Sequence, residues 1–179
     1  SGGIAPVIAA ATGDAKAKLT LPDTVIFSAA HKLNDRWELL GDVSWTGWNS
    51  IPELNILRPT GALVEKLDTK FRDTWRVAVG GNYTVNDAWK LKVGVAHDQT
   101  PIRDAAHRLA SLPDNDRTWF SLGGQWKASK TAALDFGAAY LYVRDAKINN
   151  AGTSPLQGVV TGNYKDSAWL FGAQYSMAF

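Results

Sequence analysis

Two pairs of acidic and histidine side chains come closest in this chain to a catalytic set. Asp98 directly follows His97, and His107 lies three residues after Asp104. Adjacent residues in a strand face opposite sides, so His97 and Asp98 cannot form a dyad there. The chain has three histidines, no cysteine, and no serine in a nucleophile motif. We therefore expect no enzyme, no metal site and no cofactor.

Basic side chains on the polar faces of alternating segments are the other candidates for chemistry. Arg76, Lys92 and Arg117 occupy such positions. A sheltered arginine can hold a carboxylate through two parallel hydrogen bonds. The alternative interpretation is structural: the basic groups form a ladder of salt bridges, and Arg117 pairs with Asp114 or Asp116 to order a loop. The acidic residues on the same polar faces are Glu38, Asp42 and Asp135.

The composition of the chain excludes some classes of protein. No run of about 18 apolar residues occurs in the 179 residues, so no membrane-spanning helix is predicted. Nineteen basic and seventeen acidic residues leave a net charge of +2 without a basic run, and we expect no nucleic-acid partner. Eight Trp, five Tyr and six Phe are many for this length, and aromatic rings favour the interface of a bilayer.

Seven segments alternate between apolar and polar residues with the period of two that a half-buried strand requires. In each segment the charges in the middle fall on the face opposite the apolar one. One such strand is weak evidence, whereas seven in succession favour an antiparallel all-β protein. The segments are residues 19–33, 37–48, 75–85, 89–97, 117–126, 134–142 and 169–179.

The last of these segments indicates which face lies outside. Its alternate positions are apolar, aromatic or small, and the chain stops on an aromatic residue. This pattern is typical of the closing strand of a bacterial outer-membrane barrel, with the apolar face toward lipid. A strand of a soluble sandwich is the alternative. The alternate positions are Trp169, Phe171, Ala173, Tyr175, Met177 and Phe179.

The connections alternate between short turns and long loops. The turns at residues 33–36, 85–88 and 128–131 contain Asn, Asp or Ser, and two of them repeat the pattern Asn-Asp-x-Trp. The loops cover residues 49–70, 99–116 and 147–164. Barrels of this kind place short turns at the periplasm and have an even number of strands. We therefore expect residues 1–18 to be the tail of an extracellular loop and residues 19–179 to be the C-terminal half of a larger barrel.

Three blocks and the terminal strand resemble the family of long-chain fatty acid outer-membrane transporters (FadL type), which includes aromatic-hydrocarbon importers. The terminal block is residues 168–172 with 178–179, and the most specific internal block is residues 112–117 followed by Trp119. The others are residues 71–89, with Arg76 and Gly80, and residues 143–149. The resemblance implies a fourteen-stranded barrel, of which these seven strands are the second half.

The resemblance also implies a function, which is passive uptake of long-chain fatty acids or similar hydrophobic compounds across the bacterial outer membrane. The alternatives are an aromatic-hydrocarbon importer of the same family and a structural barrel or adhesin without transport. Expected partners are the hydrophobic ligand, membrane lipid and lipopolysaccharide, and the N-terminal half of the barrel. Arg117 is the position expected to meet the ligand's carboxylate. The full set of expected ligand-binding residues is Arg117, Arg76, Trp119, Ile4, Val7 and Ile8.

Overall fold

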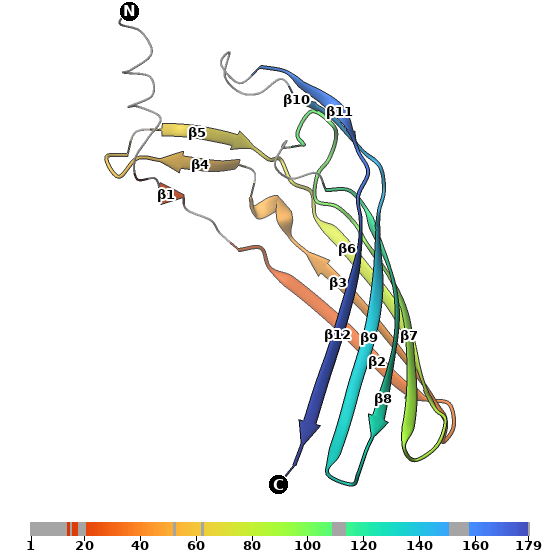
Figure 1. The fold of residues 1–179 in the computed structure, drawn as a ribbon. Helices are drawn as coiled ribbons and strands as arrows, with labels where there is room; N and C mark the ends of the chain where they lie inside the picture. The colour runs from red at the N-terminus through yellow and green to blue at the C-terminus, as the bar shows by residue number, and fades with distance from the viewer. Residues whose placement is uncertain are drawn as a thin grey trace, which may run out of the picture.

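A seven-stranded antiparallel sheet dominates the computed structural model, which describes residues 14, 16–17, 21–51, 53–61, 63–108, 114–150 and 158–178 (Figure 1). Its spatial order is β12-β9-β8-β7-β6-β3-β2. This confirms the seven predicted strands. The bounds are β2 (Thr24–Lys32), β3 (Trp37–Thr46), β6 (Thr74–Thr84), β7 (Trp89–Asp98), β8 (Arg117–Lys127), β9 (Ala132–Val143) and β12 (Ser167–Met177).

The start of β2 differs from the prediction, since the strand begins at Thr24 and not at residue 19. Pro22 has no N–H to donate to a neighbouring strand, so pairing cannot continue through it. Pairing of β2 with β3 begins just after Pro22, where Thr24 lies opposite Thr46. The other six strands match their predicted segments to within two residues at each end.

Five short strands lie outside this sheet, in or at the edge of three segments that the sequence pattern assigned to loops, residues 1–18, 49–70 and 147–164. A three-stranded sheet has the order β1-β4-β5, and β10 pairs with β11. The prediction of plain loops was therefore wrong for these regions, because strands of two to six residues are too short to establish an alternating pattern. The bounds are β1 (Lys16–Ala17), β4 (Glu53–Leu57), β5 (Leu63–Asp68), β10 (Ala146–Asn150) and β11 (Val160–Tyr164), and η1 (Trp48–Ser50) is a single 3-10 turn.

The two faces of the main sheet differ in exposure and in chemistry. Along β6 the side chains of Trp75, Val77 and Val79 are 51%, 47% and 62% exposed. The residues between them, Arg76 and Ala78, are half-buried. We call the side that carries Arg76 the sheltered face and the opposite side the exposed face. The predicted parity is confirmed, because the large apolar groups occupy the exposed face and the charges the sheltered one.

The short turns of the main sheet lie at the same end as the C terminus, and β4, β5, β10 and β11 lie at the other end (Figure 1). The repeated Asn-Asp-x-Trp pattern forms the same turn twice. Asn34 Oδ1 accepts hydrogen bonds from the backbone N–H groups of Arg36 and Trp37, each at 2.9 Å. Asn86 Oδ1 likewise accepts hydrogen bonds from the backbone N–H groups of Ala88 and Trp89, just before and at the start of β7. Asparagine therefore ends one strand and starts the next in both hairpins.

Aromatic pairs mark both ends of the exposed face. At the turn end, the rings of Trp37 and Tyr83 lie 4.7 Å apart. At the loop end, Trp45 lies opposite Trp75 in the β3–β6 register. The eight residue-to-residue steps from Trp37 to Trp45 span about 26 Å along the strand, comparable with the apolar band of roughly 25 Å of an outer-membrane barrel. Among the described residues, no helix combines the length and apolar character needed to cross a bilayer.

Inward glycines allow neighbouring strands to approach closely. Gly123 on β8 lies opposite Gly137 on β9, and a Cβ at Gly123 would lie 2.8 Å from the backbone oxygen of Phe136. Gly172 on β12 occupies the same row but has nothing within 4 Å of its Cβ position. The contact at Gly123 involves backbone, so a side chain there can be accommodated only by moving the strand.

We predict that Gly123→Ala lowers the free energy of unfolding by about 1–3 kcal/mol, the usual effect of overpacking. Gly172→Ala introduces the same side chain into open space and should change it by less than about 0.5 kcal/mol. Urea unfolding of the full-length protein in lipid vesicles, followed by tryptophan fluorescence, measures both values. Equal effects of the two substitutions would contradict the role assigned to Gly123.

Candidate functional site

The register of the sheet aligns side chains of five strands into rows across the sheltered face. The row next to the Thr46–Thr74 pair at the loop end contains Ser44, Arg76, Asp98 and Arg117. Arg76 and Arg117 come from strands that are not neighbours, and β7 supplies the aspartate between them. The structure therefore brings two of the expected ligand-binding residues together.

This loop-end row borders a cavity of about 510 Å³. Its wall is formed by four main strands, β3, β6, β7 and β8, on one side and by the 3-10 turn and the loop after β7 on the other. The cavity is thus located where the sheltered face meets the loops. Among its lining residues are Arg76, Asp98, Asp114, Arg117, Thr46 and Trp48.

Both arginines of the cavity are ion-paired within the chain. Arg117 contacts Asp98 at 2.8 Å through one terminal nitrogen and Asp114 at 3.7 Å through the other. Arg76 contacts Asp42 at 2.7 Å. The structural interpretation of Arg117 is thus confirmed for Asp114, whereas Asp116 lies instead 3.7 Å from Arg72.

Asp98 is the partner that the sequence analysis missed. It was considered only beside His97, but it shares the parity of Lys90 and Lys92 and lies directly opposite Arg117 in the β7–β8 register. The β7–β8 register is the feature from which the Asp98–Arg117 pair could have been predicted. Register across a long loop is not encoded locally, so the pair was not evident from spacing.

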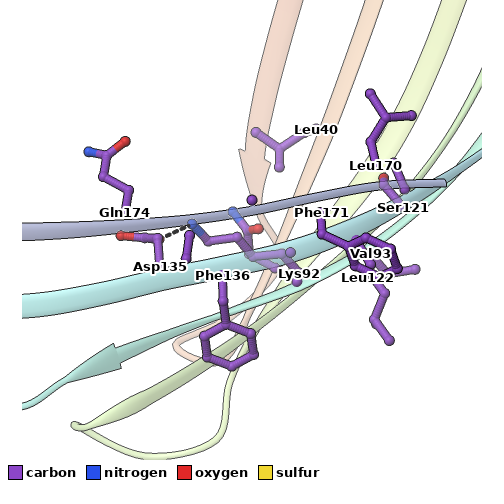
Figure 2. Close-up of a pocket in the computed structure, with 17 residues that line it drawn as sticks. Leu40, Lys92, Val93, Ser121, Leu122, Asp135, Phe136, Leu170, Phe171 and Gln174 are labelled. Carbon is purple, nitrogen blue, oxygen red and sulfur yellow. Dashed lines mark hydrogen bonds and ion pairs between the residues drawn. The ribbon is translucent and has the colours of Figure 1, made fainter.

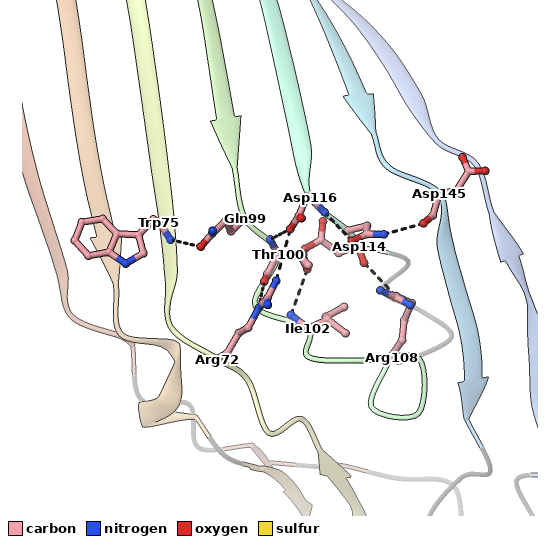
Figure 3. A network of polar contacts seen from close by, with 10 residues as sticks. Arg72, Trp75, Gln99, Thr100, Ile102, Arg108, Asp114, Asp116 and Asp145 are labelled. Carbon is pink, nitrogen blue, oxygen red and sulfur yellow. Dashed lines mark hydrogen bonds and ion pairs between the residues drawn. The ribbon is translucent and has the colours of Figure 1, made fainter.

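A network of polar contacts fixes the loop after β7 against the cavity (Figure 3). The Thr100 N–H donates to Asp116 Oδ1 at 2.9 Å, and its hydroxyl donates to Asp114 Oδ2 at 2.7 Å. Arg72 Nε donates to the carbonyl of Thr100 at 3.1 Å. Thr100 is 2% exposed, and Ile102 beside it is equally buried. Asp114 is held by this network while it contacts Arg117.

Arg108 continues the network toward the β10–β11 hairpin. Its side chain donates to the carbonyls of Asp114 and Lys147, and the residue is 5% exposed. Burial lowers the pKa of Arg108 from its usual value, and nearby Asp114 opposes the shift. Asn115 adds a second link, since its amide donates to the carbonyl of Asp145 at 2.8 Å. The loop and the hairpin are therefore joined by buried polar contacts.

Trp119, the third expected ligand-binding residue, lies in the next row of the sheltered face, between Ala96 and Leu141. Its indole N–H is buried, as is the Nε of Arg117, and neither has a hydrogen-bond partner among the described residues. The following row contains Gly80, Gly94, Ser121 and Ala139, all small. Below the ion pairs the sheltered face is thus largely uncharged.

A second group of charges lies on the sheltered face toward the turns. Lys92 Nζ contacts Asp135 at 2.8 Å (Figure 2). Gln125 also donates to Asp135. Asn82 donates to Glu38 at 2.8 Å. Lys92, Asn82 and Asp135 line a hollow of about 700 Å³. For Arg76 and Lys92 the ladder of salt bridges is confirmed.

The two acid–histidine pairs have no catalytic arrangement. His97 is on the exposed face and contacts Thr118 at 3.3 Å, whereas Asp98 faces the other way. Asp104 contacts His107 at 2.8 Å in an exposed loop, and this hydrogen bond lowers the pKa of the Asp104 carboxyl. Within the described part of the chain no three His, Cys, Asp or Glu side chains gather as metal ligands. The expected groove residues Ile4, Val7 and Ile8 lie outside the described residues.

Comparison with known proteins identifies the family. The model of the outer membrane protein transport family (OMPP1/FadL/TodX) matches residues 1–179. The chain belongs to this family. It is therefore a protein of the bacterial outer membrane, and its family is one of transport proteins rather than enzymes.

Individual members of the OMPP1/FadL/TodX family agree with this assignment. The long-chain fatty acid transport protein of Escherichia coli is 30% identical over 161 residues, which cover 90% of this chain and 34% of that protein. A FadL homologue from Pseudomonas aeruginosa superposes with a TM-score of 0.85 at 29% identity, over 91% of this chain and 37% of that one. The toluene transporter of Pseudomonas putida, at 15% identity and a TM-score of 0.60 over 92% of this chain and 37% of its own, shares the fold. The chain thus spans little more than a third of these relatives.

Proposed function

We propose that residues 19–179 form the C-terminal seven strands of a closed fourteen-stranded barrel and that residues 1–18 end an extracellular loop. In the described sheet β2 and β12 each have a strand on one side only. An open strand edge in lipid leaves unpaired backbone groups that cost several kcal/mol each. The N-terminal half of the same barrel supplies the missing strands, and lipid and lipopolysaccharide surround the exposed face.

We infer that the protein is a channel for passive uptake of long-chain fatty acids or similar hydrophobic compounds, and that it uses no cofactor. The observation that carries this proposal is the division of the sheet into an apolar exposed face and a sheltered face, on which a cavity of about 510 Å³ lies at the loop end. This cavity favours a channel over a structural barrel or adhesin.

In the proposed route the ligand first meets an apolar extracellular groove, to which Ile4, Val7 and Ile8 contribute. It then enters the cavity beside Arg117 and Arg76, with Trp119 below them, and leaves sideways into the membrane. A route that avoids water suits such ligands, because exposing each CH₂ costs about 0.8 kcal/mol. The aromatic-hydrocarbon importer remains the second candidate, because both arginines of the cavity are already paired with aspartates.

We predict that Arg117→Ala reduces oleate uptake by the full-length protein about tenfold, a change of about 1.4 kcal/mol, and leaves toluene uptake unchanged. Without this cation, Asp98 and Asp114 leave uncompensated negative charge in the cavity, which repels ionised oleate but not toluene. Uptake of radiolabelled oleate and toluene by cells that express the variant measures the effect.

Arg103→Ala is the matched control, since Arg103 lies in the same loop region, is exposed, and donates only to Asn49 among its described contacts. It should leave both uptakes unchanged. If Arg117→Ala changes neither uptake, Arg117 has no role toward the ligand. If the wild-type protein imports neither compound, the proposed function is wrong.

A further inference from the structure

The described residues that line the loop-end cavity include two arginines, Arg76 and Arg117, and two sheltered carboxylates, Asp98 and Asp114. Arg117 is shared between Asp98 and Asp114, whose side chains are 20% and 18% exposed. Arg76 is engaged by Asp42 at 2.7 Å. Each arginine that lines the cavity therefore already has a carboxylate partner from this chain, and Arg117 has two.

Among the described residues that line the cavity, the polar groups besides these ion pairs are neutral. The hydroxyls of Ser44, Thr46 and Thr74 line it together with the amide of Gln99. The row below contains Asp42, Ala78, Ala96, Trp119 and Leu141, and Asp42, its charged member, is paired with Arg76. A ligand that extends from the cavity along the sheltered face thus meets hydroxyls first and apolar groups next.

An ionised carboxylate is disfavoured in such a cavity. To reach Arg117 it must displace Asp98 or Asp114 or lie beside them. Displacement leaves a sheltered carboxylate without its partner, which is strongly unfavourable. Unpaired charge of this kind is a common means of rejecting a competing ligand. A hydroxyl or ester group, in contrast, can hydrogen-bond to the hydroxyls that line the cavity and leaves both ion pairs intact.

We propose, resting on the proposed uptake of hydrophobic compounds, that this cavity selects ligands whose polar end is uncharged, such as a long-chain alcohol or ester. Asp98 and Asp114 are the specificity-determining residues, because they neutralise Arg117 and exclude the ionised carboxylate. Their fixed positions follow from the fold. Asp98 lies opposite Arg117 in the sheet register, and Asp114 is held by the Thr100 hydroxyl.

The test compares binding of oleyl alcohol and of oleate at pH 9, where oleate is ionised, to the purified full-length protein. Isothermal titration calorimetry, in a detergent that binds the protein's cavity only weakly, gives the dissociation constants of oleyl alcohol and of oleate. We expect the wild-type protein to bind the alcohol at least about tenfold more tightly than oleate, a difference of about 1.4 kcal/mol. Asp98→Asn retains the shape of the side chain, removes its charge, and should raise the affinity for oleate about tenfold without changing that for the alcohol.

Asp145→Asn is the matched control, since Asp145 pairs with the exposed Lys165 at 3.9 Å and does not line the cavity. It should change neither affinity. Preference of the wild-type protein for oleate, or an unchanged oleate affinity in folded Asp98→Asn, would overturn the selection of uncharged ends while leaving the uptake function in place. The wild-type comparison decides the matter even if the variant does not fold. Binding of neither probe would overturn the proposed function and this inference with it.

Discussion

Arginine at position 138 should strongly weaken insertion of the protein into the membrane, whereas arginine at position 139 should allow insertion but block the ligand's path. The two alanines are neighbours in the middle of β9. Ala138 lies between Leu122 and Phe171 on the exposed face. Ala139 lies beside Ser121 on the sheltered face. The same substitution at both positions therefore tests only which face meets lipid.

The expected cost at Ala138 is about 2–4 kcal/mol, the usual penalty for an arginine facing lipid at the midplane of the bilayer. At Ala139 the guanidinium lies on the sheltered face, where charged groups such as Lys92 are already present. Folding into lipid vesicles, monitored by the heat-dependent shift in gel mobility, gives the insertion yield, and ligand uptake gives the function.

A result in which Ala139→Arg prevents insertion and Ala138→Arg does not would reverse the orientation of the sheet. The ion pairs would then face lipid, and the cavity could not receive a ligand from outside. The transport proposal depends on this one assignment more than on any single residue.

Removing the side chain of Arg108 should release the β10–β11 hairpin from the loop after β7. Arg108→Ala leaves the carbonyls of Asp114 and Lys147 without the donor of two part-buried hydrogen bonds. Each lost partner costs about 1–3 kcal/mol when the group stays buried. We therefore expect local opening to become about 2–4 kcal/mol easier, while the seven main strands stay folded.

Hydrogen exchange of the β10 amides measures this opening. The amide of Asn149, which donates to the carbonyl of Ala105 at 2.9 Å, is a direct reporter of the contact between hairpin and loop. Its exchange should accelerate at least about thirtyfold in Arg108→Ala. Arg103→Ala, on the exposed side of the same loop region, should leave it unchanged. Unchanged exchange in both variants would mean that the network does not hold the hairpin.

The main sheet was predictable because each of its strands can be identified from the order of residues within that strand alone. An apolar residue at every second position marks a strand with one face toward an apolar environment. In β6 this pattern alone placed Val77 and Val79 on one face and Arg76 on the other, as the structure has them. The turns were equally local, since an asparagine such as Asn86 bonds the backbone two and three residues ahead.

The chemistry of the loop-end cavity was only partly predictable. Parity placed Arg117 on the enclosed side and at the loop end of its strand. It did not reveal that Asp98 lies opposite, because 18 residues of loop separate β7 from β8. The short strands β10 and β11 were missed for a related reason. Their few residues carry no clear alternation, and they are defined by pairing with each other.

The amino-acid sequence by itself determined the seven strands, the face of each that is apolar, the tight turns and the family. These depend on side-chain period and turn chemistry within about ten residues, which is the length of a strand. Only the tertiary structure decided which charges neutralise one another and where the cavity lies. Ion pairing depends on register between strands joined by long loops, and register is a property of the assembled sheet.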